Sequence, residues 1–85
     1  MTNIEFDVLD ELYFLQSYKY LSKTLDFSDE QLKSTLRSLL EKGWLKCYKS
    51  PIEEIAFESV DFEKEYWNYY YLASKAGLLA HNSDF

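Results

Sequence analysis

The chain has 85 residues, 19% of them aromatic, and a net charge of −6 at pH 7. This length predicts one small domain, and the acidic balance argues against strong binding to nucleic acid or to an anionic membrane surface. A single cysteine excludes an internal disulfide. The sequence shows neither a signal peptide nor a run of about 18 apolar residues, which predicts a cytoplasmic protein with no membrane partner.

The first predicted element is a helix over about residues 4–16. Ile4, Val8, Leu12 and Leu15 recur at helical spacing and form one apolar face. The carboxylates of this segment fall outside that face, and we interpret them as a solvated face.

A second helix is predicted over about residues 17–25. Ser17 can cap its amino end, and Tyr18, Leu21 and Leu25 give it an apolar face.

The third helix, over about residues 29–42, has the clearest signals. Ser28 can cap it, and Gln31 completes an S-x-x-Q capping box. Gly43 can adopt the left-handed conformation that ends a helix. The apolar stripe consists of Leu32, Leu36, Leu39 and Leu40.

Two strands and a short helix are predicted after the third helix. Strand composition occurs over about residues 44–49 and again over residues 66–73. The intervening residues 51–65 carry six acidic residues and one lysine, a net charge of −5, and are interpreted as a long hairpin tip with room for extra strand pairing. A last helix is predicted over about residues 75–82.

Three short motifs carry a resemblance to a known family: VLDEL at 8–12, LLEKGWL at 39–45 and YYLASKAG at 70–77. In this order and spacing the chain resembles the winged helix-turn-helix domains of bacterial transcription regulators. The resemblance implies a mainly α fold with a small antiparallel β-hairpin: a three-helix core, a wing and a short C-terminal helix, all in one domain over residues 1–85. It also implies that the third helix enters the major groove of DNA while the wing contacts phosphates.

If the third helix reads DNA, its contacts come from the positions off the leucine stripe. Arginine and glutamine can bind guanine and adenine edges, small serines allow close approach, and lysines bind phosphates. The acidic tip at 51–65 opposes this function, because phosphate contacts supply much of the affinity for DNA. The expected DNA-contacting residues are Gln31, Lys33, Ser34, Arg37, Ser38, Lys19 and Lys23.

The alternative is a protein-interaction module on the same fold, bound to a partner protein or to a second copy as a homodimer. If Tyr70 and Leu72 face the core, as the resemblance requires, strand alternation exposes Trp67, Tyr69 and Tyr71. Three aromatic side chains on one exposed face would form an interaction patch together with the acidic tip.

No arrangement of residues in the sequence indicates catalysis. We find no Ser-His-Asp pattern, no metal-ligand spacing and no glycine-rich phosphate loop. Cys47 lies in the first predicted strand at a core position and is expected to be a buried thiol. The sequence therefore predicts a protein that is not an enzyme, with no cofactor, no metal and no small-molecule ligand.

Overall fold

Helix α3 (Asp29–Glu41) lies at the centre of the fold in the computed structural model, which describes residues 1–83. Its capping box is formed as predicted: Ser28 Oγ accepts from the Gln31 amide at 3.1 Å, and Gln31 Oε1 accepts from the Ser28 amide at 3.0 Å. Gly43 follows with φ of 75°, the left-handed conformation expected after the helix. The predicted start and end of this helix are confirmed to within a residue.

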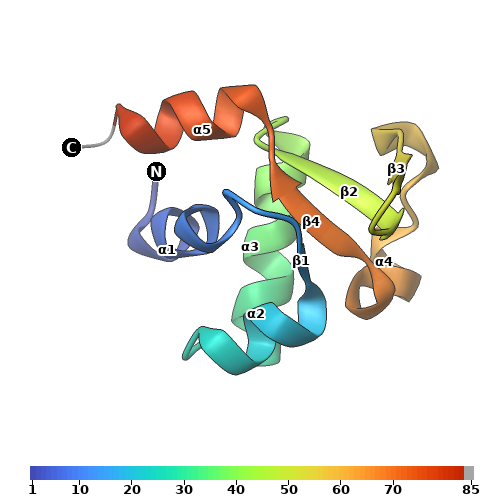
Figure 1. Cartoon of the computed structure of the whole chain (residues 1–85). Helices are drawn as coiled ribbons and strands as arrows, with labels where there is room; N and C mark the ends of the chain where they lie inside the picture. The colour runs from blue at the N-terminus through green and yellow to red at the C-terminus, as the bar shows by residue number, and fades with distance from the viewer. Residues whose placement is uncertain (84–85) are drawn as a thin grey trace.

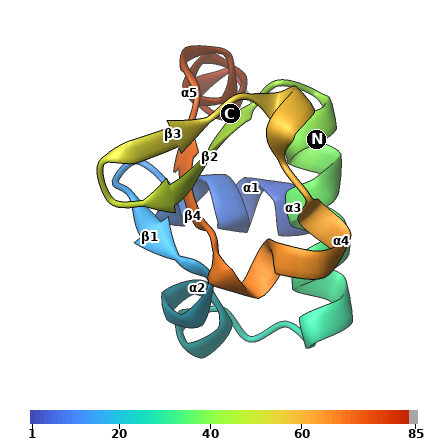
Figure 2. The same cartoon turned by 90° about the vertical axis from the view of Figure 1, so that its right-hand side faces the viewer.

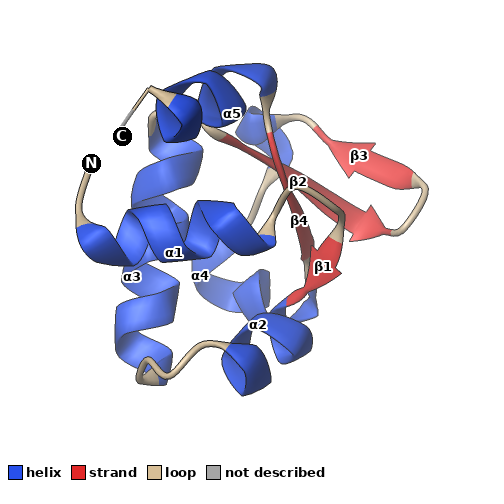
Figure 3. Cartoon of the chain, turned by 60° about the vertical axis from the view of Figure 1, so that its left-hand side comes forward, coloured by secondary structure: helices blue, strands red, loops and turns tan. Residues whose placement is uncertain are grey.

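Helices α1 (Asn3–Glu11) and α2 (Tyr18–Thr24) pack with α3 on one side of a small sheet (Figure 3). The contact is made by the leucine stripe of α3 and by apolar residues of α1 and α2, which are at most 1% exposed. They are Val8, Leu9, Leu12, Leu21, Leu32, Leu36 and Leu39. At about 0.8 kcal/mol per buried CH₂ group, this cluster is the main source of stability in so short a chain.

The sheet has four antiparallel strands: β1 (Gln16–Ser17), β2 (Leu45–Ser50), β3 (Glu53–Ile55) and β4 (Tyr70–Ala73). Their order is β1-β4-β2-β3, so β4 and β2 are central and β3 forms an outer edge (Figure 1). This is a compact α+β domain.

The predicted extension of the first helix to residue 16 is wrong, because α1 ends at Glu11. Instead, Gln16 pairs with Tyr71 and Ser17 pairs with Tyr70, which makes β1 the partner of a strand more than fifty residues away. The apolar spacing continues past the end of α1, but the sheet provides these backbone groups with better-placed partners.

The second predicted strand begins later than expected. Of residues 66–73, only β4 is extended, and η2 (Tyr66–Asn68) forms a 3₁₀ turn. Between β3 and β4 the chain also forms η1 (Phe57–Ser59) and α4 (Phe62–Glu65). We call residues 56–68 the covering segment, because it folds back beside α3 (Figure 2).

Helix α5 (Lys75–Asn82) matches the predicted last helix, with Ser74 as its N-cap. A Cβ at Gly77 would overlap the Trp44 carbonyl oxygen, so the helix approaches the start of β2 closely. His81 is buried against α1, where its ring stacks on Phe6 with centroids 4.1 Å apart. Its Nδ1 also lies 2.8 Å from the Tyr13 hydroxyl.

Candidate functional site

The two basic side chains of α3, Lys33 and Arg37, lie one turn apart on the flank that faces α4. Nζ of Lys33 lies 2.9 Å from Oε2 of Glu63 in α4. The Arg37 guanidinium pairs with Oε1 of the same carboxylate. The side chains of Lys33, Arg37 and Glu63 remain 32%, 43% and 56% exposed. One carboxylate from the covering segment thus pairs with both cations of the helix.

Two aromatic rings flank the same ion pairs. The Arg37 Cζ atom lies 5.7 Å from the centroid of the Phe62 ring, and Lys33 Nζ lies 5.0 Å from that of Tyr66. Both distances lie in the range of cation–π attraction. The flank of α3 is therefore held by charge and by aromatic contact together.

Asp29, at the start of α3, fixes the far end of the covering segment. The Tyr66 hydroxyl donates to Asp29 Oδ2 at 2.8 Å, and the Tyr18 hydroxyl of α2 donates to Oδ1. These hydrogen bonds, first that from Tyr18 and then that from Tyr66, lower the pKa of the Asp29 carboxyl. Burial, followed by the nearby carboxylate, raises the pKa of Tyr18. One carboxylate thereby joins α2, α3 and η2.

The outward side of α3 is acidic. Glu30, Ser34 and Glu41 are exposed there, whereas the predicted DNA contact Gln31 uses its side-chain oxygen for the capping box. Arg37 belongs to the same turns, but its guanidinium, like the Lys33 ammonium, is paired with Glu63.

Ser38, another predicted DNA contact, is half-buried and donates to Glu5 of α1 at 3.2 Å. Glu5 is only 5% exposed, and its Oε2 accepts a hydrogen bond from Lys42 Nζ at 2.6 Å. Burial alone would raise the pKa of Glu5, but the hydrogen bonds from Lys42, Thr2 and Ser38 lower it overall. Ser38 therefore helps to bind α1 to α3.

The predicted phosphate-binding lysines of α2 are in a different situation. Lys19 and Lys23 are exposed, as the amphipathic pattern of this helix requires. Lys19 and Lys23 belong to α2, whereas Lys33 and Arg37 belong to α3. Seven predicted contact residues thus divide into an exposed set, Lys19, Lys23 and Ser34, and a set that binds other parts of the chain, Gln31, Lys33, Arg37 and Ser38.

The predicted aromatic face is wrong in its register. Tyr69 and Tyr71 are 7% and 0% exposed and belong to the core, while Tyr70 and Leu72 are only partly buried. Trp67 alone of the three is on the surface, at 52% exposure. The Tyr71 hydroxyl donates to the Tyr66 carbonyl at 2.8 Å, so this polar group is satisfied inside the fold.

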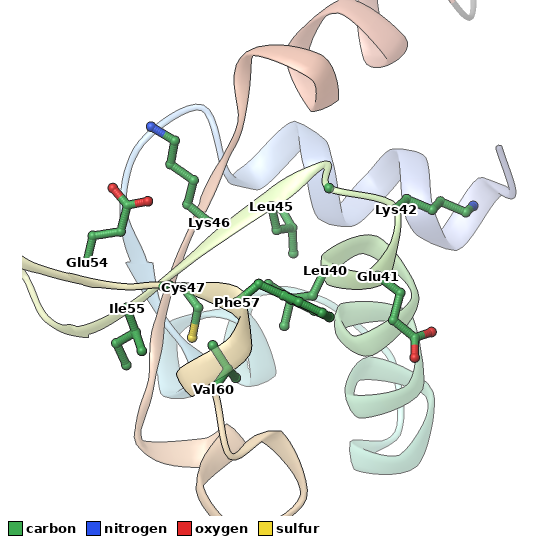
Figure 4. A pocket seen from close by; sticks show the side chains of 12 residues that line it. Leu40, Glu41, Lys42, Leu45, Lys46, Cys47, Glu54, Ile55, Phe57 and Val60 are labelled. Atoms are coloured by element: carbon green, nitrogen blue, oxygen red, sulfur yellow. The ribbon is translucent and has the colours of Figure 1, made fainter.

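A cavity of about 330 Å³ separates the covering segment from the end of α3. Figure 4 shows the side chains of Leu40, Cys47 and Phe57 directed toward this space, while the charged ends of Lys42 and Lys46 point away from it. A neighbouring cavity of about 280 Å³ is lined by Arg37, Phe57 and Phe62. The apolar side chains around the first cavity are Leu40, Leu45, Cys47, Ile55, Phe57 and Val60.

Cys47 is 2% exposed, as predicted, and burial raises the pKa of its thiol to about 12. A thiol in this setting stays protonated near neutral pH and is chemically inert. It acts as a small apolar side chain.

Sequence reasoning missed the residues that meet the flank of α3 from a distance in the chain. Glu63 lies in the predicted acidic tip and Tyr66 in the predicted second strand. Nothing in the local pattern of these two segments indicates contact with Lys33 or Asp29. The alternation of acidic and aromatic residues in the covering segment is the only available signal.

Within residues 1–83, no three histidine, cysteine, aspartate or glutamate side chains are grouped so that they could hold a metal ion. None of the helices in this range is both long and apolar enough to cross a membrane. Comparison of the chain with protein-family models, with curated proteins and with solved structures gave no match.

Proposed function

We propose that the chain is a winged helix-turn-helix domain of the kind that binds a protein, and that its partner presents a basic surface. The order of the elements supports the first part: three helices precede an antiparallel strand pair, β2 and β4, and a short helix follows. We propose a cytoplasmic location for this activity.

The observation that carries the proposal is the pairing of both α3 cations with Glu63. A helix that reads DNA needs free positive charge near the phosphates. Here the outward side of α3 carries Glu30 and Glu41, and the covering segment beside it adds exposed Glu58 and Glu65. This surface attracts lysine and arginine side chains and repels phosphates.

Exposed aromatic side chains add apolar contact area to the same part of the molecule. Phe57 and Trp67, at the two ends of the covering segment, are 57% and 52% exposed. Aromatic residues are enriched in protein interfaces and often dominate their binding energy. Because both surfaces of a homodimer would be acidic, we propose a different protein as the partner instead of a second copy.

The first test is the binding of the whole chain to random-sequence duplex DNA, measured by fluorescence anisotropy in about 50 mM salt, where DNA-binding domains show non-specific affinity. We expect no binding at high micromolar protein. Clear binding that weakens with added salt would contradict the proposal.

The second test reverses the charge of the acidic surface. The double variant Glu30→Lys/Glu41→Lys should lose a partner captured from cell extract, and Trp67→Ala should weaken its capture. Glu53→Lys, which changes the charge of β3 away from α3, serves as the control and should retain the partner. Equal capture by all three variants would exclude this surface.

DNA binding by α3 is the second candidate function, and one observation favours it. Lys33 and Arg37 lie on successive turns of a single flank, as phosphate-contacting residues do, and Lys19 and Lys23 are exposed on α2. In this alternative the contacts of α3 become available only after Glu63 leaves.

A further inference from the structure

We infer that the cavity between the covering segment and the end of α3 receives one large apolar side chain of the partner protein. This side chain is a phenylalanine or a residue of similar size, and lysine or arginine residues flank it in the partner. The inference rests on the proposed function, because it names the part of the basic partner that binds. It requires no displacement of Glu63 from its ion pairs.

The inner wall of this cavity is apolar. Leu40, Leu45 and Cys47, from α3 and β2, are 6%, 6% and 2% exposed. Ile55 and Val60, from β3 and the covering segment, are partly buried beside them. Because the Cys47 thiol stays protonated, these five side chains carry no charge. An apolar side chain that enters the cavity therefore gains free energy by leaving water.

The size of the cavity suits a single side chain. Its volume is about 330 Å³, and an apolar protein cavity of about 150 Å³ is large enough to hold benzene, the ring of a phenylalanine. The cavity also reaches the surface, because Phe57 and Glu41 line it and are exposed. A ring that enters from solvent can therefore contact the ring of Phe57, which adds to the burial of apolar area.

Exposed carboxylates border the opening. Glu41 and Glu54 line the cavity, and Glu58 lines the neighbouring cavity of about 280 Å³. All three are exposed, and within residues 1–83 none of them forms an ion pair. Figure 4 shows the side chains of Glu41 and Glu54 on opposite sides of the apolar groups. Lysine or arginine residues on both sides of an inserted side chain would each meet a carboxylate.

The cations that line the two cavities are directed elsewhere. Nζ of Lys42 donates to Oε2 of Glu5 at 2.6 Å, and the Arg37 guanidinium pairs with Glu63. The charged ends of Lys42 and Lys46 point away from the first cavity (Figure 4). The site thus combines an apolar pocket with an acidic border, and protein interfaces commonly bind an anchor side chain in a pocket of this kind.

The test uses short peptides as probes. Two of them carry two lysines on each side of a central residue, which is phenylalanine in one and alanine in the other. We expect the phenylalanine peptide to bind the whole chain at least about tenfold more tightly, because only its ring buries apolar area in the cavity. A third peptide has phenylalanine at the centre and glutamine in place of every lysine, and it should bind more weakly than the basic phenylalanine peptide. NMR titration measures the affinities, and the methyl groups of Leu40 and Leu45 should shift most.

Two variants of the chain and one control locate the binding. Val60→Phe fills the cavity and Phe57→Ser removes an exposed part of its lining, so each should reduce the preference for phenylalanine to less than about twofold. Ile52→Phe adds the same ring at a position that is 95% exposed and outside the cavity, and it should keep the preference. Urea denaturation verifies that each variant is folded.

The outcomes separate the inference from the proposed function. Equal affinity of the phenylalanine and alanine peptides would overturn the inference and leave the acidic surface as proposed, because charge alone would then explain the binding. A preference for phenylalanine that survives in both Val60→Phe and Phe57→Ser would also overturn it. Equal affinity of the lysine and glutamine peptides would contradict a basic partner, and with it the proposed function, while the apolar cavity would remain a binding site.

Discussion

The two sides of helix α3 are held by different forces. On the core side, Leu32, Leu36 and Leu39 are at most 1% exposed and are stabilised by burial of apolar surface. On the other side, the covering segment is attached by exposed ion pairs, by the Tyr66–Asp29 hydrogen bond and by rings that border cavities. The difference shows that the fold depends mainly on the core side, while the covering segment is attached by exposed polar contacts.

The largest effect should come from the core side. Leu36→Ala removes a fully buried side chain and should lower the free energy of unfolding by about 2–5 kcal/mol, which urea denaturation would measure. Ser34→Ala, on the exposed side of the same helix, should change it by less than about 0.5 kcal/mol. Similar losses of unfolding free energy in both variants would mean that the core side of α3 contributes no more to stability than the exposed side.

A second core contact involves backbone instead of side chains. Gly77→Ala would place a Cβ against the Trp44 carbonyl oxygen and should destabilise the domain by about 1–3 kcal/mol in thermal unfolding. Gly43→Ala meets no neighbour within 4 Å but is strained at φ of 75°, so any loss of stability in that variant comes from backbone strain and not from a clash. A neutral Gly77→Ala variant would show that α5 can move away from β2.

Glu5 combines features of both sides of α3, because it is a charged residue that is buried at the edge of the core. Glu5→Gln should cost about 1–3 kcal/mol, since Lys42 and Ser38 lose a charged acceptor. The pKa of Glu5 is lowered in the folded state, so its ionised form stabilises the protein above the ordinary value of 4.5. That contribution is lost as the pH falls through the folded pKa.

Unfolding measured from pH 7 to pH 3 should therefore show a smaller loss of stability in Glu5→Gln than in the unmodified chain. Asp7→Asn, an equal change of charge at an exposed position of α1, should follow the unmodified chain. Parallel curves for all three would contradict a stabilising role for the Glu5 carboxylate.

The smallest effect on global stability should come from the covering segment. Glu63→Gln removes only exposed ion pairs and should change the free energy of unfolding by less than about 1 kcal/mol. Hydrogen exchange at residues 62–68 should nevertheless accelerate, because the segment loses its link to Lys33 and Arg37. Equal exchange rates at these residues in Glu63→Gln and Glu53→Gln would show that the covering segment opens only together with the core.

Features that depend on neighbouring residues could be predicted from the sequence, whereas contacts between distant residues could not. The capping box of Ser28 and Gln31, the end of α3 at Gly43 and the extent of α5 are local features, and the structure confirms them. These signals depend on residues within about four positions of one another, so a single sequence carries them in full.

The failures all involve partners far apart in the chain. Leucine spacing continues beyond Glu11, and only pairing with Tyr70 and Tyr71 turns Gln16 and Ser17 into a strand. In the run of tyrosines before Ala73, either alternate set of side chains could face inward, so composition could not fix the register of β4. The contact of Glu63 with Lys33 and Arg37 spans about thirty residues, and charge pattern alone does not reveal it.

The position of Cys47 has a practical consequence. Its thiol borders the cavity beneath the covering segment and, with a pKa raised to about 12, is unreactive while it stays enclosed. It is the only cysteine in the chain, so the rate at which a thiol reagent labels it reports one opening event. If Cys47 is labelled faster in Glu63→Gln without a matching loss of global stability, the labelling rate measures how often the covering segment opens. The single thiol thus serves as a built-in probe of this motion.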